Sequence, residues 1–378
     1  GKTLDEKISS ESKVGNNLHT SLDLKSHQAA HKALNNRKGA VVAIDINDGS
    51  IVTLFSSPTF STNQLANGIL QKDFDELLLS EEKPFFNRAL RGRYPPASSI
   101  KPAIAMYGIE EGLIDWNFSI FDEGFFTLPE DGRIYRDWKE GGHGDTNLFK
   151  AITQSSNTYF FDLAYRSDIN QLNKHLSSLG FGNKACIDCF EEDQVFVPEP
   201  SWKINKHNFG WFKGDTVNMG VGQGYLVSTP IQLAKYAYIM ANKGKFSDLS
   251  LKKDLVKSEK SIEFNKFSND DWFKLHESMV NVIEGNTGTA RRLREKKNYI
   301  VAAKTGTAEL VSGDNREQYS ETRLDDSLRD HALIIAFGPM PNPRYAVSVV
   351  VENGESGGSV AGPVAISVLN SLIQEWDI

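Results

Sequence analysis

The chain has 378 residues, in which 42 Lys and Arg are outnumbered by 49 Asp and Glu, so its formal net charge is −7. With 39% hydrophobic and 24% charged residues, the composition is that of a globular protein and excludes collagen-like and wholly disordered chains. The acidic excess argues against nucleic-acid binding as the main function, because phosphate binding needs clustered Lys and Arg.

A membrane-spanning helix needs about 20 apolar residues. The apolar runs of this sequence are much shorter, as residues 332–337 and 347–351 illustrate, and no secretory signal is recognisable. The chain starts at Gly1 and not at Met, from which we expect that a membrane anchor preceded it.

The N-terminal part predicts a polar arm, a helix and a hairpin. Residues 1–16 are polar and without periodicity, and a hydrophilic surface helix is predicted near residues 24–35. Residues 39–56 are predicted to form a β-hairpin, because Asn47-Asp48-Gly49 separates two β-branched runs and these residues tolerate positive φ.

The middle of the chain, from about residue 98 to 290, has a mostly helical pattern. The elements expected there and beyond are helices at 148–153, 158–165 and 169–179, strands at 331–337 and 345–352, and a final helix at 363–376. Strands near both ends of the chain predict a single sheet that the N- and C-terminal segments close together. The fold class is therefore α+β, with a large helical insertion between sheet strands.

Cys186 and Cys189 form an isolated CxxC pair. A redox pair is expected beside a strand-to-helix turn, and a four-thiolate zinc site would need a second pair of cysteines. We therefore expect two partly buried free thiols, and the cysteines alone do not indicate a compartment.

The sharpest chemical pattern is Tyr94-Pro95-Pro96-Ala97-Ser98-Ser99-Ile100-Lys101-Pro102. At the start of a helix, a spacing of three puts Ser98 and Lys101 on one face. A lysine in a desolvated pocket can lose its proton near neutral pH and then accept the proton of the serine. The SxxK spacing occurs at Ser10, Ser80, Ser98 and Ser250. Only at Ser98 does it lie between a Pro-Pro turn and an apolar helix.

Two further motifs follow at long intervals. Ser155-Ser156-Asn157 lies between two predicted helices, although Ser61-Thr62-Asn63 has the same form. Lys304-Thr305-Gly306-Thr307 occurs once, after the apolar residues 300–303. It predicts an exposed strand in which Gly306 lets a substrate backbone approach closely.

In this order, SxxK, SxN and KTG are typical of β-lactamases and penicillin-binding proteins. The chain resembles the penicillin-binding transpeptidases from about Gly15 to its end. Segments such as Asp137-Trp138-Lys139 and Gly222-Gln223-Gly224-Tyr225 are similar to the monofunctional (class B) members that act in cell elongation. The resemblance implies an antiparallel sheet flanked by helices, with a large all-helical subdomain. It also implies a transpeptidase domain at residues 15–378, preceded by a pedestal remnant at residues 1–14.

The resemblance also implies a role for each motif residue. Ser98 would attack the carbonyl of a terminal D-Ala-D-Ala bond, with Lys101 as its general base. Ser155 would relay the proton to the departing D-Ala, and Asn157 would position the donor backbone and Lys101. Lys304 would maintain the electrostatic field of the cleft.

Substrate binding falls to the KTG segment. Thr305 and Thr307 would bind the terminal carboxylate beside Gly306, and the N–H groups of Ser98 and Thr307 would form the oxyanion hole. Acylation of Ser98 would be followed by attack of an amine from a neighbouring stem peptide, and β-lactams would acylate the same serine.

Residues 220–224 are rich in glycine but lack both the Lys-Ser/Thr of a phosphate loop and the GxGxxG order. A tight structural turn behind the site is therefore favoured over a nucleotide-binding loop.

No cofactor is required, but some family members carry zinc on two Asp, one His and one Cys near the SxN motif. The matching positions here are Asp122, Asp137, His143 and Ser156. Serine is a poor zinc ligand beside thiolate. Two outcomes remain open: a structural zinc that is weakened or absent, or a hydrogen-bonded cluster that holds the loop unaided.

The alternatives are a serine β-lactamase or D,D-carboxypeptidase, a non-catalytic penicillin sensor, and a scaffold for membrane partners. The sequence has no convincing counterpart of the glutamate that activates water in class A β-lactamases, and sensor domains are shorter.

The expected partners are peptidoglycan stem peptides on a lipid-linked precursor, β-lactam antibiotics, a membrane glycan polymerase and other elongation-complex proteins, with no nucleic acid. The expected location is the periplasmic face of the bacterial inner membrane. Residues 313–326 are predicted to form a flexible loop over the cleft.

Overall fold

The computed structural model describes residues 14–253, 255, 257–310 and 328–373. The predicted pedestal remnant therefore lies outside the described residues except for Val14, and the predicted loop at residues 313–326 lies wholly outside them. Among the described residues, no helix combines the length and the apolar character that crossing a membrane requires.

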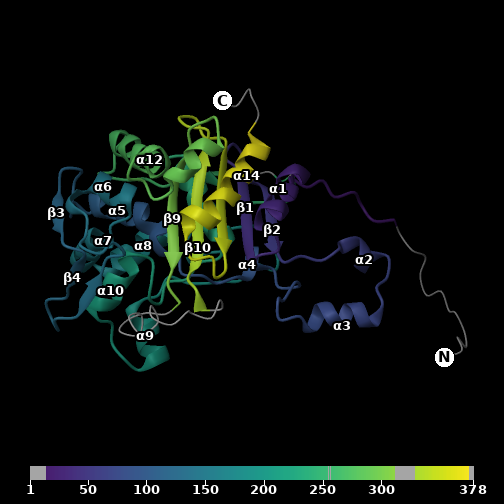
Figure 1. The fold of residues 1–378 in the computed structure, drawn as a ribbon, viewed down its shortest axis with the longest axis horizontal. Coiled ribbons are helices and arrows are strands. Elements are labelled where there is room, and N and C mark those ends of the chain that lie inside the picture. The colour runs from purple at the N-terminus through teal and green to yellow at the C-terminus, as the bar shows by residue number, and fades with distance from the viewer. Residues whose placement is uncertain (1–13, 254, 256, 311–327, 374–378) are drawn as a thin grey trace, which may run out of the picture.

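A five-stranded antiparallel sheet forms the centre of the molecule (Figure 1). Its strands are β1 (Gly39–Asp45), β2 (Ser50–Ser57), β9 (Ala302–Ala308), β10 (His331–Gly338) and β11 (Tyr345–Val351). Their order is β2-β1-β11-β10-β9, so the N-terminal hairpin pairs with the C-terminal strand, from Gly39 opposite Val351 to Asp45 opposite Tyr345. The predicted hairpin and the predicted closure of one sheet by both ends are confirmed.

Both faces of the sheet are covered, which explains why its strands read as almost continuous apolar runs. Helices α1 (Leu24–Leu34) and α14 (Gly362–Leu372) pack on one face, and α11 (Pro230–Ala241) packs on the other. Successive side chains of a strand point to opposite faces. Val41 and Val349 accordingly belong to the core under α1 and α14, whereas Val42 and Val350 belong to the larger core shared with the helical region.

The region between β2 and β9 is mostly helical, as predicted. From residue 101 onward, its helices include α5 (Lys101–Glu110), α6 (Leu148–Gln154), α7 (Asn157–Arg166), α8 (Ile169–Ser178), α9 (Pro200–His207), α10 (Lys213–Gly220), α11 and α12 (Asn269–Glu284). Three two-stranded sheets interrupt the helices: β3 (Ser119–Asp122) with β6 (Gly144–Asn147), β4 (Phe125–Thr127) with β5 (Ile134–Arg136), and β7 (Lys245–Ser247) with β8 (Glu259–Ser261).

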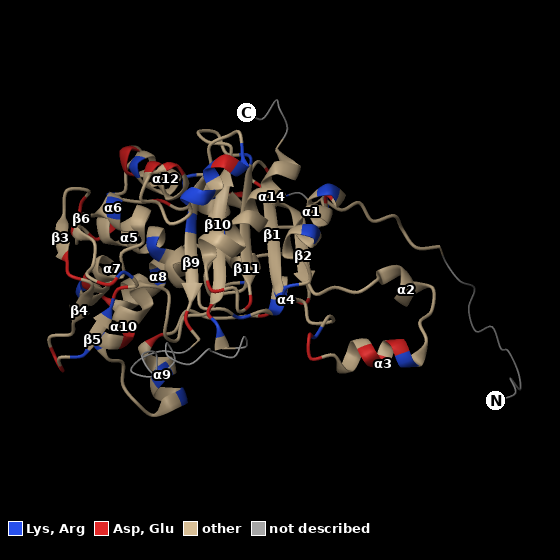
Figure 2. Cartoon of the chain, viewed as in Figure 1, with Lys and Arg blue, Asp and Glu red and all other residues tan. Residues whose placement is uncertain are grey.

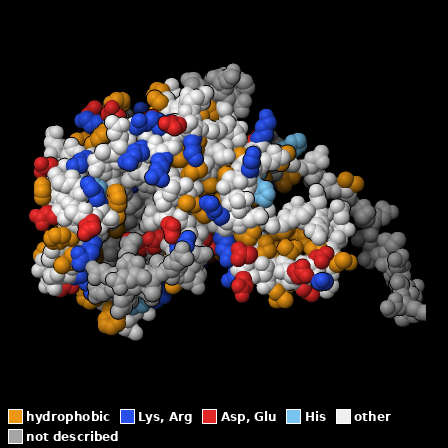
Figure 3. All heavy atoms as spheres, viewed as in Figure 1, with side chains coloured by type: hydrophobic (Ala, Val, Ile, Leu, Met, Phe, Trp, Pro, Cys, Tyr) orange, Lys and Arg blue, Asp and Glu red, His pale blue; other side chains and the backbone are white. Residues whose placement is uncertain are grey.

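A short helical segment stands away from this body. It contains α2 (Thr62–Ala66) and α3 (Gln71–Leu79), and Figure 1 shows it projecting beyond the sheet edge. Hydrophobic side chains gather on this segment in Figure 3. Leu78 and Leu79 of α3 are exposed. Charges of both signs are otherwise spread over the outer helices and loops, while the central strands carry few (Figure 2).

The prediction of free thiols at Cys186 and Cys189 is wrong, because the two residues form a disulfide. The turn between them brings their Cα atoms to 5.4 Å, within the usual range for such a bond. Both residues are also more buried than expected.

Candidate active site

Ser98 lies in the turn η1 (Ala97–Ile100), which leads directly into α5. Pro102 is accommodated there because the first turn of a helix has N–H groups without intrahelical acceptors. The Ser99 hydroxyl donates to the carbonyl of Pro96 at 2.6 Å and closes the turn. Ala97 has a φ of +49°, an uncommon conformation for a residue with a side chain, directly before Ser98.

The predicted structural turn at residues 220–224 supports this conformation. The N–H of Ala97 donates to the carbonyl of Gly222 at 2.9 Å. Gly222 has a φ of +73°, and a Cβ there would collide with the carbonyl oxygen of Ala97. Glycine is therefore required for this turn to lie against the Ser98 segment.

Lys101 is fully buried, and its amine is held by the SxN segment. Nζ donates to the Ser155 carbonyl at 2.8 Å and to Asn157 Oδ1 at 2.7 Å, and it lies 3.3 Å from Ser155 Oγ. Burial lowers the pKa of Lys101 to about 7, although the carboxylates of Asp137 and Asp122 oppose this shift. The neutral amine is therefore well populated near neutral pH.

Lys304 approaches the same hydroxyl from strand β9. Its Nζ lies 2.8 Å from Ser155 Oγ and 3.1 Å from the carbonyl of Thr305. Burial, and then the neighbouring charge of Lys101, hold the pKa of Lys304 well below its ordinary value. Two amines thus converge on one serine hydroxyl.

Ser155 occupies a strained position at the end of α6. Its φ is +61°, and its N–H donates to the carbonyl of Ala151. A residue with a side chain adopts this conformation only when its surroundings enforce it. Here the indole Nε1 of Trp138 donates to the Ser155 carbonyl at 3.1 Å, together with Lys101.

The Ser98 hydroxyl itself has no hydrogen-bond partner among the described residues, because Lys101 is turned toward Ser155 and Asn157. Hydrogen bonds of catalytic groups are often long or unformed in enzymes without substrate. The structure thus brings Lys101, Ser155, Asn157 and Lys304 into one contact network, with Ser98 on the adjoining turn.

The prediction of an exposed KTG strand is wrong. Lys304 is fully buried and Thr305 is only 7% exposed, because η1 and the turn η4 (Gly357–Ala361) pack against β9. A Cβ on Gly306 would lie 3.2 Å from the carbonyl oxygen of Pro96. The glycine therefore admits the protein's own Ser98 turn, which a sequence pattern alone could not distinguish from a substrate backbone.

Three side chains at the site carried no predicted role. The hydroxyls of Thr289 and Thr305 lie 2.7 Å apart, and Gln223 Nε2 donates to the Thr307 carbonyl at 3.3 Å. The third is Trp138. Gln223 and Trp138 belong to segments that resemble the class B transpeptidases, so the sequence could have indicated them as site residues. Thr289 lies in a turn without motif or periodicity.

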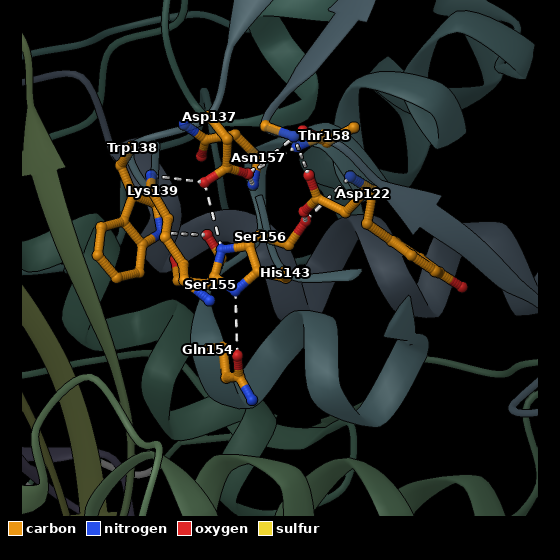
Figure 4. Close-up of polar contacts among 12 residues, drawn as sticks. Asp122, Asp137, Trp138, Lys139, His143, Gln154, Ser155, Ser156, Asn157 and Thr158 are labelled. Carbon is orange, nitrogen blue, oxygen red and sulfur yellow. Dashed lines mark hydrogen bonds and ion pairs between the residues drawn. The ribbon is translucent and has the colours of Figure 1, made fainter. Parts of the chain in front are cut away.

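The four positions proposed for a metal also come together (Figure 4). Ligand atoms of Asp122, Asp137 and His143 all lie within 4.8 Å of one another, and Ser156 Oγ donates to Asp122 Oδ2 at 2.7 Å. Burial would raise the pKa of Asp137, but hydrogen bonding from His143 and the charge of Lys101 outweigh it and lower that pKa to about 2.

A serine on a helix-leading turn, two buried lysines and an SxN segment together define the class of serine acyl-transfer proteins that react with β-lactams. Residues 39–370 match the family model described as penicillin binding protein transpeptidase domain, and the chain belongs to this family. The predicted domain limits, residues 15–378, extend beyond this match and stay a prediction.

Among its relatives, the chain is 40% identical over 356 residues to the peptidoglycan D,D-transpeptidase MrdA of Acinetobacter baumannii, covering 92% of this chain and 52% of that protein. Pseudomonas aeruginosa PBP2, solved in complex with WCK 5153, matches with a TM-score of 0.85 and 36% identity over 95% of this chain and 79% of that one. Helicobacter pylori PBP2, solved in complex with MreC, matches with a TM-score of 0.85 and 30% identity over 94% and 63%. These similarities confirm the predicted elongation-type resemblance and the predicted fold. The chain spans little more than half the length of the MrdA relatives.

Proposed function

We propose that this chain is the catalytic part of a peptidoglycan D,D-transpeptidase of the elongation type, with Ser98 as its nucleophile. The observation that carries the proposal is the meeting of Lys101 and Lys304 at the Ser155 hydroxyl, next to the Ser98 turn. The family membership and the MrdA relatives support the same reaction.

In the first step, Ser98 Oγ forms a bond to the carbonyl carbon of the penultimate D-Ala and gives its proton to Lys101. A pKa of about 7 suits this general base. The C–N bond to the terminal D-Ala then breaks, and the leaving amine receives a proton through Ser155 Oγ, which both lysines contact. The product is an ester on Ser98 and a free D-Ala.

The N–H groups of Ser98 and Thr307 are the proposed oxyanion hole, which stabilises the negative charge that develops on the carbonyl oxygen. Thr307 is proposed to bind the substrate carboxylate together with Thr305, and the Thr289 hydroxyl orients the Thr305 hydroxyl for this role. Lys304 is proposed to supply positive potential to the same end of the cleft in its protonated form, which burial and the charge of Lys101 make less populated by lowering its pKa.

In the second step, an amine of a neighbouring stem peptide attacks the Ser98 ester. The new amide bond forms, the ester bond breaks, and Ser98 recovers its proton. A β-lactam follows the first step only, since its ring-opened amine stays attached and blocks the acceptor.

We further propose that this reaction takes place at the periplasmic face of the bacterial inner membrane, beside a glycan polymerase. The support is similarity alone: the MrdA relatives are named peptidoglycan D,D-transpeptidases, and H. pylori PBP2 was solved in complex with MreC.

The nucleophile is tested with a fluorescent penicillin and intact-mass measurement. The wild type should gain one adduct, and Ser98→Ala should gain none. Ser80→Ala is the matched control, because Ser80 begins another SxxK but ends α3, leads into a turn and lies in a surface segment. Labelling that persists in Ser98→Ala would exclude Ser98 as the nucleophile.

The reaction class is tested with a pentapeptide ending in D-Ala-D-Ala and an amine acceptor, analysed by mass spectrometry. A transpeptidase produces an amide-linked dimer and free D-Ala. Hydrolysed donor without dimer would indicate a carboxypeptidase, and rapid catalytic opening of the penicillin would indicate a β-lactamase.

A further inference from the structure

Four polar side chains from separate segments surround the start of α7. Asp122 ends β3, Asp137 follows β5, His143 precedes β6, and Ser156 is the N-cap of α7. Asp122, His143 and Ser156 are buried. The spacing of the two carboxylates and the imidazole suits a metal ion, so the fit of zinc to these residues has to be judged from their contacts.

Ser156 does not offer a free ligand atom. Its hydroxyl donates to Asp122 Oδ2 at 2.7 Å and accepts from the N–H of Tyr159 at 3.1 Å, as an N-cap serine does. A neutral hydroxyl is also a weak zinc ligand, whereas a thiolate in the same place would be a strong one. Zinc binding here would require breaking the Asp122 contact or the cap.

The carboxylates are engaged as well. Asp137 Oδ2 accepts from the N–H groups of Asn157 at 2.6 Å and Thr158 at 3.0 Å. Its Oδ1 accepts from the N–H of Lys139 at 3.0 Å and lies 3.2 Å from His143 Nε2. Asp122 Oδ1 accepts from the N–H of Gly124 at 2.8 Å.

The imidazole lies between two oxygens, as Figure 4 shows. His143 Nε2 faces Asp137 and Nδ1 lies 3.0 Å from Gln154 Oε1. The side-chain amide of Gln154 in turn donates to the hydroxyl of Thr287 at 3.1 Å. Among the described residues, no side-chain nitrogen or oxygen of this cluster is buried without a partner.

We infer that Asp122, Asp137, His143 and Ser156 form a metal-free clamp, which holds the Ser155–Asn157 segment by hydrogen bonds alone. Zinc does not fit this donor set because serine replaces the ligand that would bind the ion most strongly. Asp137 fixes the first two N–H groups of α7, Ser156 joins the helix to β3, and Asn157 Oδ1 is thereby aimed at Lys101. The four are positioning residues, since Lys101 donates to Ser155 and Asn157 and, among the described residues, to no side chain of the four.

The first test is metal content, which does not depend on the proposed function. The wild type and Ser156→Cys are produced with added zinc, dialysed without chelator, and measured by elemental analysis. We expect less than about 0.1 zinc per chain in the wild type and about one in Ser156→Cys, because a thiolate completes a tetrahedral set. Near-stoichiometric zinc in the wild type would overturn the inference, as would the absence of zinc from Ser156→Cys.

The second test separates positioning from helix capping. Ser156→Ala removes the cap and the Asp122 contact, whereas Asp168→Ala removes the cap of the next helix, α8, which does not include the SxN segment. Both variants should lower the melting temperature. Only Ser156→Ala should slow penicillin acylation, by about tenfold, and Ser156→Thr should restore the rate because it keeps the hydroxyl. Equal acylation rates in the two alanine variants would overturn the positioning role.

A chelator should change neither the melting temperature nor the acylation rate of the wild type. A decrease in the melting temperature or in the acylation rate would overturn the metal-free clamp.

Discussion

The Ser155 hydroxyl is contacted by both lysines of the site. Lys101 Nζ and Lys304 Nζ lie 3.3 Å and 2.8 Å from the same oxygen, and both amines are buried. Two protonated amines so close together repel each other, so the pair holds fewer than two protons near neutral pH. This arrangement makes a neutral lysine available without a neighbouring histidine.

Acylation should therefore depend on pH through Lys101. The base is the neutral amine, so the second-order rate of penicillin acylation should rise with pH, bend near about 7 and then level off. Lys101→Arg keeps a permanent charge and should lower the rate by at least about 100-fold while removing the bend. Stopped-flow fluorescence measures both.

Lys203→Arg is the control for placing a larger cation in a buried site, because Lys203 is buried but pairs with Asp215. It should keep the wild-type profile. A wild-type rate that is flat from pH 5.5 to 9 would contradict the assignment of Lys101 as the base.

Thr289 should contribute through the hydroxyl of Thr305. Thr289→Val removes one hydrogen bond at nearly constant volume, so acylation should slow by about 2- to 12-fold, corresponding to about 0.5–1.5 kcal/mol. Thr53→Val is matched to it, since Thr53 also donates to a hydroxyl, that of Ser26, and lies on β2 at the opposite edge of the sheet. The Thr53 variant should lose stability but not acylation rate, and an equal slowing in both would show that the Thr289 effect is not local.

The sequence predicted which residues gather here but not how they touch. The order of the three motifs indicated Ser98, Lys101, Ser155 and Lys304 because acyl transfer needs these groups. It did not indicate that Gly306 packs against the Ser98 turn. A glycine in a sequence indicates that another group approaches the backbone closely, but it does not identify that group. Such contacts depend on residues far apart in the chain.

At the scale of elements, the site is built from the ends of helices and not from their middles. The C-cap of α6 and the N-cap of α7 are the adjacent residues Ser155 and Ser156, so the two helices change direction where the SxN segment is needed. The Ser98 turn is likewise an irregular start of α5. Unpaired N–H and C=O groups at such ends are free to bind side chains.

The turn at Gly222 should be essential to this arrangement. Gly222→Ala would force the Ala97 carbonyl away, so acylation should fall by at least about tenfold. Gly224→Ala is the matched control: its φ is +76°, but the nearest atom to a Cβ is the Asn218 side chain at 3.2 Å. Both variants lose about 1 kcal/mol of stability from the unfavourable φ. Equal acylation rates in the two variants would contradict the role assigned to Gly222.

Elements with several turns or alternations were predictable, and short ones were not. The helices near residues 148–179 and the β1–β2 hairpin lie within two residues of their predicted limits. Strands β3 to β6 contain three or four residues each, too few to display a period of two. Their places are set by contacts with α7 and with each other.

At the scale of the whole molecule, one ion pair joins the segment before Ser98 to the end of the sheet. Arg88 Nε donates to Glu352 Oε1 at 2.9 Å across 264 residues of sequence, and the hydroxyl of Tyr94 donates to the same oxygen at 2.7 Å. The Arg88 side chain is only 3% exposed, so its charge is stabilised by this carboxylate and by the carbonyls of Glu82 and Lys83 in place of water. These contacts hold the segment that precedes the Ser98 turn against the end of β11.

Breaking this pair should destabilise the protein as a whole. Glu352→Met leaves Arg88 buried without a counter-ion, so the free energy of unfolding should fall by about 3 kcal/mol. Asp270→Asn removes the exposed pair with Lys274 and should cost much less, because solvent screens that pair. Urea unfolding monitored by circular dichroism measures both, and equal losses would mean that the Arg88 pair has no special role.

The pairing of β1 with β11 also bears on when the site is complete during synthesis of the chain. Gly39 and Val351 are neighbours in the sheet, yet almost the whole chain separates them, and ordering such a loop is slow. A chain that emerges from its N-terminus presents Ser98 and Lys101 early, while β9, β10 and β11 arrive last. The approach of Lys304, which lies on β9, to the Ser155 hydroxyl must wait for them. A growing chain therefore carries an incomplete site until its last strands are in place.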